Sequence, residues 1–539
     1  MYSIKNVTFI FFLMVLLFSC SPSRFNPLHL EYLVYMSDSA ALCTDVYVPG
    51  KGKYPTILVR TPYNKETEKW MGKAFGLYKI NIVIQDVRGR YKSEGTFYPF
   101  LNERADGLKT IDWIKKQPWS NGKIGGWGGS YVGYTQWCIS DSLDFLSPVL
   151  SGADIFDLFY PDGVFSLQSA FTWAAHNSSS TETSIAYEKI RKAYNILPLS
   201  AAADSIGGAE FIHDWLAHER EDAYWKNLNY RGITKAPVLS IAGWYDIFLM
   251  AQIKDFLSLP ERNPASRLVI GPWCHGKQAY PNEYGGLKKT GNPRKIFAYT
   301  VKVCKGRKAR LSTPLTDAPI NLFIMERNEY VGADTWPPKE TQLTPFYLHP
   351  DRTLQESTGQ TNDSIAFLYN PSLPFPSSGG TVLGDSAGPA LQNRTENRND
   401  MVIFDKQIDS IPLILLGPVS ATLYLSSNVK CTDAVVCLQD VFPDGKIINI
   451  QEGAAHIEFE KKLPEPKKVS VWATGYQVNP GHKLRVIITS SWFPRFNRNL
   501  NACNDIKTAT QVLPARQVLF LGSTYPSCIH LPVYQPITR

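Results

Sequence analysis

The sequence predicts an α/β protein in which a mostly parallel sheet is interrupted by a helical insertion and followed by an all-β domain. Apolar strand-like runs alternate with helical stretches from about residue 32 to residue 314. The segment inserted between two of these strands has a residue pattern that favours helices, and a helical insertion of this kind is typical of a cap. From about residue 315, short strands with frequent Pro, Gly, Asn and Asp are typical of a β-sandwich or jelly roll. The predicted boundaries are 28–155 and 235–314 for the sheet domain, 156–234 for the cap and 315–539 for the β-sandwich.

Each predicted element of the sheet domain has its own signal. The runs "YLVYM", "ALCTDVYVP", "YPTILVR" and "NIVIQDV" are rich in β-branched and aromatic residues, so they predict strands. Residues 103–117 predict a helix, because Ala105, Leu108, Ile111 and Ile114 recur on one face. The segment "KIGGWGG" then predicts a strand and "YVGYTQWCIS" a helix. The continuous apolar runs "FLSPVLSGA", "APVLSIAGW" and "SRLVIGPW" predict three further strands, buried on both faces in a mostly parallel sheet.

The first twenty residues predict an export signal. An early lysine precedes an apolar run from Val7 to Phe18, which is too short to span a bilayer. The end of this segment, "LFSC", resembles the lipobox of bacterial lipoproteins, in which the cysteine becomes the lipid-modified first residue. Residues 1–20 are therefore expected to be a lipoprotein signal peptide, with Cys20 lipidated and the mature chain held in the cell envelope. The alternative is an ordinary cysteine in the apolar segment and a freely secreted product.

Composition excludes several classes of function. The chain has 539 residues, 44% of them hydrophobic and 19% charged, so it is folded rather than disordered. A net charge of +8 over this length is too dilute for a nucleic-acid surface. The cysteines lack the paired spacing of a zinc site, and we expect no metal and no cofactor. Membrane contact is expected only through the lipid anchor. A disulfide is expected between Cys503 and Cys528. The sequence specifies no oligomeric state.

Ser130 lies between glycines at a strand-to-helix turn, in "GGWGGSYVGYTQW". A serine hydroxyl becomes a good nucleophile when a histidine accepts its proton and a carboxylate orients that histidine. In α/β-hydrolases these residues occur in the order Ser, Asp, His at the ends of successive strands. Asp246 follows "APVLSIAGWY" and His275 follows "SRLVIGPWC". Any one of the three could be an ordinary turn or cap residue, but all three at strand ends predict a catalytic triad.

The resemblance to a known family covers almost the whole mature chain. The segments "VRTPYNK", "QDVRGRYKSEGTF", "DGLKTIDWIKKQPWSNGKIGGWGGSYVGYTQW", "AGWYDIF", "RLVIGPWCHG", "VFPDGK" and "SSWFPRFNRNLN" resemble the CocE/NonD hydrolases. That family includes cocaine esterase, α-amino acid ester hydrolases, cephalosporin acylases and X-Pro dipeptidyl-peptidases. The resemblance implies an α/β-hydrolase domain, an inserted helical cap and a C-terminal jelly roll of the galactose-binding-like kind.

The resemblance also implies roles for individual residues. Ser130 would be the nucleophile, His275 the general base and then acid, and Asp246 the orienting carboxylate. Tyr63 matches the family tyrosine whose hydroxyl shares the oxyanion hole with the backbone N–H after the serine, here that of Tyr131. Such a hydroxyl, fixed by a rigid ring, can point at the developing negative charge. We expect the segment 86–90, "DVRGR", to hold a loop through an Asp–Arg pair rather than to take part in catalysis.

The substrate remains open between several hypotheses. Trp127, Trp244 and Trp273 flank the triad positions and could line an aromatic pocket with Phe248, although core packing explains them equally well. We expect hydrolysis of an ester or amide with an uncharged acyl part. The α-amino acid ester hydrolases place carboxylates two and three residues after the triad aspartate, where this chain has Phe248 and Leu249. The alternatives are X-Pro dipeptidyl-peptidase activity on short peptides, or an inactive hydrolase fold that serves as a surface-binding lipoprotein. Carboxylates of the cap region could still bind an ammonium group; the candidates are Asp154, Asp157, Glu182 and Glu188.

Overall fold

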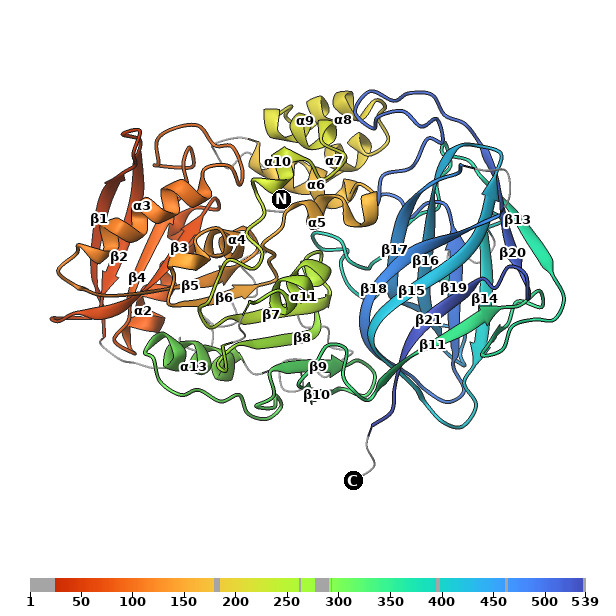
Figure 1. The fold of residues 1–539 in the computed structure, drawn as a ribbon. Coiled ribbons are helices and arrows are strands. Elements are labelled where there is room, and N and C mark those ends of the chain that lie inside the picture. The colour runs from red at the N-terminus through yellow and green to blue at the C-terminus, as the bar shows by residue number, and fades with distance from the viewer. Residues whose placement is uncertain are drawn as a thin grey trace.

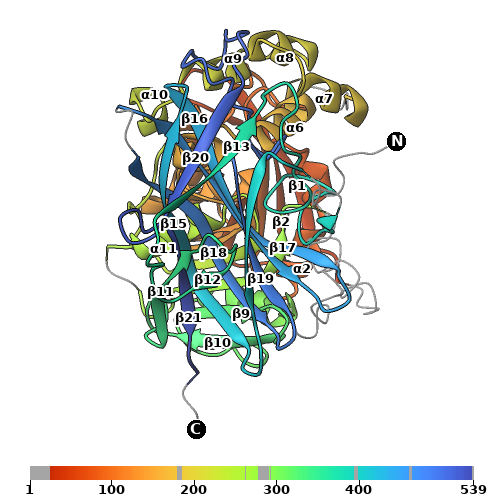
Figure 2. The same ribbon diagram turned by 90° about the vertical axis from the view of Figure 1, so that its right-hand side faces the viewer.

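The computed structural model describes residues 25–178, 185–260, 263–276, 290–291, 293–393, 398–460 and 464–536. Figure 1 shows a sheet flanked by helices, a group of helices above it and a β domain beside it. In Figure 2, which is turned by 90°, the strands of the β domain lie in front of the sheet domain. This arrangement confirms the predicted fold class, an α/β-hydrolase domain with a helical cap and a C-terminal all-β domain.

The sheet domain contains a ten-stranded sheet. Its strands are β1 (Leu28–Tyr35), β2 (Ala41–Val48), β3 (Tyr54–Thr61), β4 (Asn81–Asp86), β5 (Ser120–Gly129), β6 (Phe145–Val149), β7 (Leu239–Tyr245), β8 (Arg267–Cys274), β9 (Ile320–Ile324) and β10 (Glu329–Ala333). They are ordered β1-β2-β4-β3-β5-β6-β7-β8-β9-β10. The strands from β3 to β9 pair in parallel, whereas β1, β2 and β10 pair antiparallel at the edges. Because β9 and β10 belong to this sheet, it continues past the boundary predicted at residue 314.

Helices cover both faces of this sheet. They are η2 (Lys65–Glu68), α2 (Trp70–Gly76), α3 (Glu103–Lys115), α4 (Tyr131–Trp137), η3 (Ser140–Ser142), α11 (Leu249–Leu257) and α13 (Pro293–Cys304). Helix α3 occupies most of the predicted range 103–117. Ile111 and Ile114 are buried as expected, but Ala105 is exposed. The buried face of α3 includes charged side chains that form ion pairs, and the apolar pattern gave no sign of them.

The cap consists of short helices inserted between β6 and β7, and it lies above the sheet in Figure 1. Its described helices are α5 (Phe156–Phe159), η4 (Pro161–Gly163), α6 (Leu167–Asn177), α7 (Tyr187–Ala193), α8 (Leu199–Ser205), α9 (Glu210–Ala217) and α10 (Ala223–Lys226). Aromatic rings hold the cap together and join it to the sheet domain. The ring of Phe159 stacks on Trp215 at 4.1 Å between centroids, and Trp173 stacks on Tyr131 at 5.9 Å.

The β domain is a sandwich of two antiparallel sheets. Its strands are β11 (Thr341–Leu348), β12 (Leu354–Gln355), β13 (Asp363–Tyr369), β14 (Met401–Gln407), β15 (Leu413–Ser427), β16 (Cys431–Val441), β17 (Ile447–Glu458), β18 (Glu465–Val478), β19 (Lys483–Thr489), β20 (Ala515–Leu521) and β21 (Cys528–Tyr534). One sheet follows the order β12-β11-β21-β15-β20-β13, with β18 on β15, and the other the order β14-β19-β16-β17. The β domain shares a hydrophobic core with the sheet domain. The side chain of Gln451 in β17 donates to the Trp244 carbonyl in β7 (3.0 Å).

The disulfide prediction was wrong. Cys503 is bonded to Cys431 at the start of β16, with 5.4 Å between their Cα atoms. Cys528, the predicted partner, is a buried free thiol in β21. Spacing along the chain cannot reveal this pairing. The β-sandwich brings the loop after β19, which contains Cys503, next to the start of β16, although the two cysteines are 72 residues apart in the sequence.

The membrane predictions concern residues that the structure does not describe. The signal segment 1–20 and Cys20 lie outside the described residues. Within the described ranges, no helix combines the length and the apolar character that crossing a bilayer requires.

Candidate active site

Ser130 occupies a sharp turn between β5 and α4. Its backbone has φ 56° and ψ −130°, a conformation that is costly for any residue other than glycine and that cannot belong to a strand or a helix. Glycines on both sides leave room for this turn. A Cβ atom on Gly128 would lie 2.3 Å from a methyl group of Val132, and one on Gly133 would lie 2.4 Å from the Cβ of Ser151. The turn therefore presents the Ser130 side chain at the end of the strand, as in a nucleophile elbow.

The structure brings Ser130, His275 and Asp246 into one chain of hydrogen bonds. Nε2 of His275 lies 3.0 Å from Oγ of Ser130, and Nδ1 lies 2.8 Å from Oδ2 of Asp246. The other carboxylate oxygen accepts from the backbone N–H of Phe248 (2.8 Å). All three side chains are buried; Asp246 has no exposed surface. With Nδ1 donating to the carboxylate, Nε2 can accept the serine proton.

The hydroxyl of Tyr63 lies beside the serine. It accepts a hydrogen bond from the indole N–H of Trp173 in α6 (3.0 Å). Burial raises the pKa of Tyr63, and hydrogen bonds with Trp173, the Ser130 side chain and the Tyr131 backbone partly offset this shift. The phenol therefore stays protonated at neutral pH. Because Trp173 supplies a donor to the oxygen, the hydroxyl proton of Tyr63 can point into the site.

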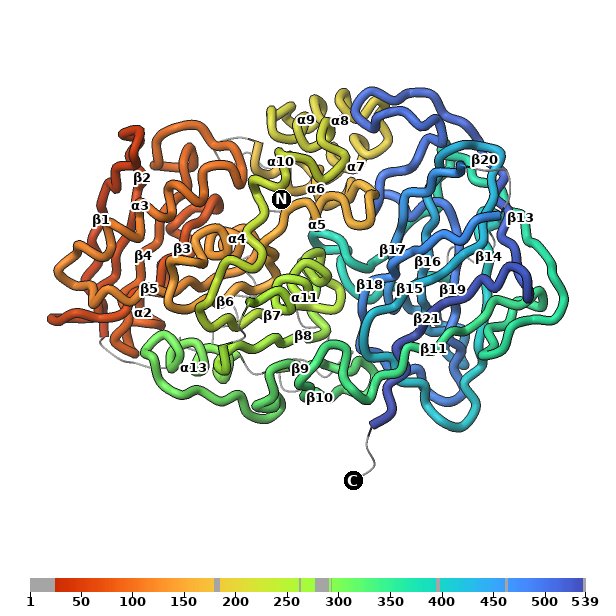
Figure 3. Tube along the Cα trace, in the orientation of Figure 1, coloured from red at the N-terminus to blue at the C-terminus, as the bar shows by residue number. Residues whose placement is uncertain are grey.

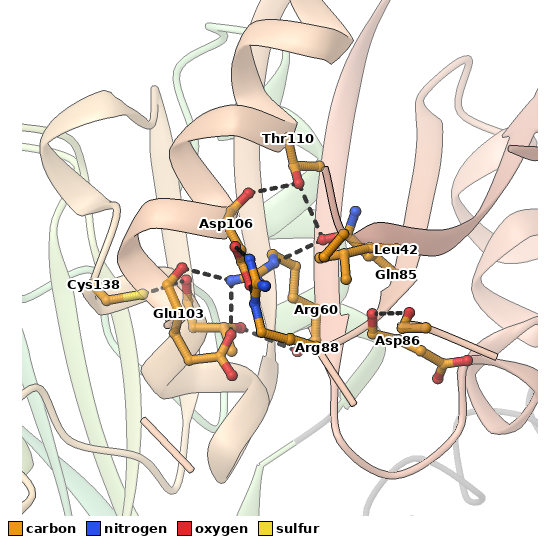
Figure 4. A network of polar contacts seen from close by, with 12 residues as sticks. Leu42, Arg60, Gln85, Asp86, Arg88, Glu103, Asp106, Thr110 and Cys138 are labelled. Carbon is orange, nitrogen blue, oxygen red and sulfur yellow. Dashed lines mark hydrogen bonds and ion pairs between the residues drawn. The ribbon is translucent and has the colours of Figure 1, made fainter. Parts of the chain in front are cut away.

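A buried ion pair lies behind the nucleophile turn. The Tyr131 hydroxyl donates to Oε1 of Glu103 (2.7 Å), and Nη1 of Arg60 lies 2.8 Å from Oε2 of the same carboxylate. Arg60 also donates to the Gln85 side chain (2.9 Å), and Figure 4 shows Arg60 with Gln85 and Glu103. Burial raises the pKa of Glu103, and the charge of Arg60 opposes this shift. The network fixes the side chain of Tyr131, whose backbone N–H is the predicted oxyanion donor.

A small apolar cavity opens beside Ser130 and His275. It is lined by Phe100, Ser130, Tyr131, Tyr134, Ile155, Leu158, Phe159, Ser169, Trp173, Ile247, Phe248, His275 and Leu383. No Asp, Glu, Lys or Arg occurs among these lining residues. Among the described residues, no group of three or more His, Cys, Asp or Glu side chains could hold a metal ion.

Of the four predicted pocket aromatics, Phe248 lines this cavity and the three tryptophans do not. The ring of Trp127 packs against Phe75 at 5.6 Å in a separate cluster. The indole N–H of Trp244 donates to a backbone carbonyl of β9 (2.6 Å). The ring of Trp273 packs against Gly271 in β8. These tryptophans lie within β5, β7 and β8, where side chains pack in the core. The triad residues, in contrast, follow the ends of those strands.

Sequence reasoning missed most of the other residues that line the cavity, and two of these show how distant parts of the chain reach the site. Trp173 comes from cap helix α6, and Leu383 comes from a loop of the β domain. The aromatic residues of the cap were a signal for Trp173, although nothing in their spacing distinguished it from its neighbours. No sequence signal pointed to Leu383, because its contact with the site depends on the packing of the two domains.

The segment 86–90 is held differently from the prediction. Asp86 accepts from the backbone N–H of Lys65 (2.7 Å), and burial raises its pKa to about 7. Arg88 forms ion pairs with Asp106 (2.7 Å) and with an exposed aspartate of the β1–β2 turn (2.6 Å). The Arg–Asp pairs therefore use carboxylates outside the segment. Arg90 donates to the carbonyl of the residue before Tyr63 (2.9 Å), so this loop supports the Tyr63 backbone.

The fold and the strained serine turn define an α/β-hydrolase with a cap and a C-terminal β domain. Residues 38–277 match the family described as X-Pro dipeptidyl-peptidase (S15 family), and residues 316–530 match the X-Pro dipeptidyl-peptidase C-terminal non-catalytic domain. The chain is 30% identical to cocaine esterase of Rhodococcus sp. (strain MB1 Bresler), over 93% of this chain and 97% of the esterase. The chain thus belongs to the CocE/NonD family of serine hydrolases.

Solved structures agree on the fold. An aminopeptidase from the marine sediment archaeon Thaumarchaeota archaeon superposes with a TM-score of 0.80 at 22% identity, over 96% of this chain and 99% of that protein. An α-amino acid ester hydrolase superposes with a TM-score of 0.79 at 22% identity, over 96% of this chain and 98% of that protein. The two-domain architecture with its cap is therefore common to enzymes named for different substrates, so the substrate must be argued from the site itself.

Proposed function

We propose that this serine hydrolase cleaves esters or amides with an uncharged acyl part through an acyl-serine intermediate. Oγ of Ser130 attacks the substrate carbonyl carbon while His275 accepts the serine proton at Nε2. His275 then gives this proton to the leaving alcohol or amine, and the acyl group stays on the serine. A water molecule, deprotonated by His275, attacks the acyl-serine and releases the acid, and the serine regains its proton. Asp246 holds the ring and stabilises its cationic form during both halves of the reaction.

The observation that carries the substrate class is the lining of the cavity, in which none of the described residues is an ionised carboxylate or a cation. An ammonium group placed there would lose its hydration without gaining a partner, at a cost of several kcal/mol. The nearby cap carboxylates have other partners. Asp154 and Asp157 both contact Arg231 (3.2 and 2.5 Å), and the exposed Glu188 pairs with Lys192 (3.0 Å). Glu182 lies outside the described residues.

Esters of matched shape test this proposal. The 4-nitrophenyl esters of 3-phenylpropanoate and of phenylalanine differ only by the α-ammonium group. We expect kcat/KM at neutral pH to be at least about 100-fold higher for the uncharged ester. Binding of the phenylalanine ester is opposed by several kcal/mol, because its ammonium group is desolvated without gaining a partner. An equal rate, or a preference for the amino acid ester on the same enzyme preparation, would contradict the assignment of the acyl site.

We further propose that Tyr63 and the Tyr131 backbone N–H stabilise the oxyanion. Replacing Tyr63 with phenylalanine removes one hydroxyl and keeps the ring, so the fold should be preserved. The expected result is a fall in kcat of about 10²- to 10³-fold, the usual loss for one such donor. Kinetics of the purified variant, with its melting temperature as the control, measure this effect. An unchanged kcat would limit Tyr63 to a packing role.

X-Pro dipeptidyl-peptidase activity is the second candidate, and the two matched family descriptions favour it. A peptide substrate of that class carries a free terminal ammonium group two residues before the cleaved bond. The apolar lining beside Ser130 argues against it. Release of 4-nitroaniline from Gly-Pro and Ala-Pro 4-nitroanilides distinguishes the candidates, because rapid release would reverse their order.

The third alternative is an inactive hydrolase fold that serves as a binding protein. The buried hydrogen-bond chain from Ser130 to Asp246 disfavours it.

We also propose that the protein is exported and attached to the membrane through a lipid on Cys20. The Cys431–Cys503 disulfide supports an oxidising compartment. Because the lipid would act only as a tether, Cys20→Ala should move the protein from the membrane fraction to the soluble fraction with no loss of esterase activity. Fractionation of cells that express each form measures this. Wild-type protein that is already fully soluble after export would refute the anchor.

A further inference from the structure

A loop of the β domain reaches the catalytic histidine. This segment, residues 380–384, lies between β13 and β14, and the turquoise part of the tube in Figure 3 extends toward the sheet domain. The backbone N–H of Gly384 donates to the carbonyl of His275 (2.9 Å). The side chain of Leu383 lines the cavity beside Ser130. The β domain therefore supplies one wall of the acyl site and a hydrogen bond to the histidine backbone.

The same loop is bound by the cap. The carbonyl of Leu383 accepts from Nε2 of Gln168 (2.6 Å), and its N–H donates to Oε1 of Gln168 (3.0 Å). Both contacts are buried. One glutamine of helix α6 thus satisfies the donor and the acceptor of Leu383, so the cap, the β domain and the triad meet at this residue.

A buried ion pair in the β domain holds the start of the loop. Oε1 of Glu452, in β17, accepts from the N–H and the hydroxyl of Thr381 (2.9 Å each). Arg495 lies 2.9 Å from that oxygen and donates through Nη1 to the Thr381 carbonyl (2.5 Å). Both charged side chains are 1% exposed. The pair therefore binds the donor and the acceptor of a single residue two positions before Leu383.

The Glu452–Arg495 pair packs directly against the backbone at the start of the loop. Gly380 has φ +79°, and a Cβ atom there would lie 2.3 Å from Oε1 of Glu452. Burial lowers the pKa of Arg495 to about 10, although the neighbouring Glu452 carboxylate opposes this shift. A buried ion pair is weak evidence for stability, because its desolvation offsets its attraction. A role in fixing the position of the loop explains why both charges face Thr381.

We propose that Glu452 and Arg495 are positioning residues that hold Leu383 against the acyl group and support the backbone of His275, so that the β domain sets selectivity for acyl length. This inference rests on the proposed acyl-serine mechanism. An acyl chain that reaches Leu383 gains apolar contact in the transition state, whereas an acetyl group beside Ser130 is too short to do so. Displacement of the loop should therefore reduce activity on the longer chain more than on the shorter one.

The test compares 4-nitrophenyl hexanoate with 4-nitrophenyl acetate. In Glu452→Met/Arg495→Met both charges are removed together, so no unpaired buried charge remains. We expect the ratio of kcat/KM for hexanoate over acetate to fall about tenfold or more, the usual effect of a lost apolar contact in an acyl pocket. A purely structural role would lower the folded fraction, which reduces both values by the same factor and leaves the ratio unchanged.

Further variants keep the test decisive. Gly380→Ala leaves both charges in place but forces the loop away from Glu452, and we expect the same fall in the ratio. Asp405→Met/Arg485→Met removes another ion pair of the β domain (2.8 Å), on β14 and β19, and should leave the ratio as in wild type. A wild-type ratio in folded Gly380→Ala or in the folded double variant would overturn the inference. If the Ser130→Ala variant kept its esterase activity, that result would instead overturn the proposed acyl-serine mechanism.

Discussion

Replacing Ser130 with alanine is expected to lower kcat for ester hydrolysis by about 10⁶-fold, the scale recorded when a triad nucleophile of another hydrolase is removed. The reason is the geometry of the turn. Ser130 Oγ lies within hydrogen-bond distance of His275 Nε2, so it is the hydroxyl whose proton the histidine can accept as the acyl intermediate forms. Steady-state kinetics with a 4-nitrophenyl ester measure the effect, and the residual rate shows what the oxyanion donors contribute alone.

Ser169 offers a matched control for this substitution. It lies in α6, lines the same cavity and is 3% exposed, but its hydroxyl contacts Gln168 rather than His275. Ser169→Ala should change kcat far less than Ser130→Ala. A Ser130→Ala enzyme that retains even a hundredth of the wild-type kcat would contradict an acyl-serine mechanism at this residue.

Replacing Asp246 with asparagine is expected to lower kcat by about 10⁴-fold with little change in the fold. The amide keeps the shape of the carboxylate, and its oxygen can still accept from the Phe248 backbone N–H. Its NH₂ group would then face Nδ1 of His275 and favour the ring tautomer in which Nε2 carries the proton. That tautomer cannot accept the proton of Ser130. The loss should appear in kcat, because Asp246 does not line the acyl cavity.

Asp440→Asn is the corresponding control in the β domain. Asp440 has no exposed surface and binds His482 (2.9 Å) and the hydroxyl of Tyr476 (3.0 Å), so the same chemical change is made at an equally buried site. It should reduce the melting temperature without a comparable loss of kcat. If Asp246→Asn and Asp440→Asn had equal effects on kcat, Asp246 would be structural rather than catalytic.

Much of the site could be predicted from the sequence because its chemistry follows strand ends. The parallel order of β5, β7 and β8 brings the residues after these strands to one edge of the sheet, so Ser130, Asp246 and His275 meet there. The same rule explains why Trp244 and Trp273 do not line the cavity. They lie within their strands, where neighbouring side chains pack in the core.

Contacts between distant parts of the chain could not be predicted in this way. Leu383 reaches the cavity only because the β domain packs on the sheet domain, and its partner Gln168 is 215 residues away. The Cys431–Cys503 bond depends in the same way on the path of one loop in the sandwich. Residue types and spacing describe local structure and strand ends, whereas these contacts follow from the packing of one domain on another.

The most direct test of the central claim is covalent labelling of the folded protein with a fluorophosphonate, followed by peptide mass spectrometry. The reagent reacts at a useful rate only with a serine whose proton is taken up by a neighbouring base. We expect a single phosphonylated peptide containing Ser130, and no labelling of the Ser130→Ala protein. Labelling at another serine, or folded and catalytically active protein that remains unlabelled, would contradict it.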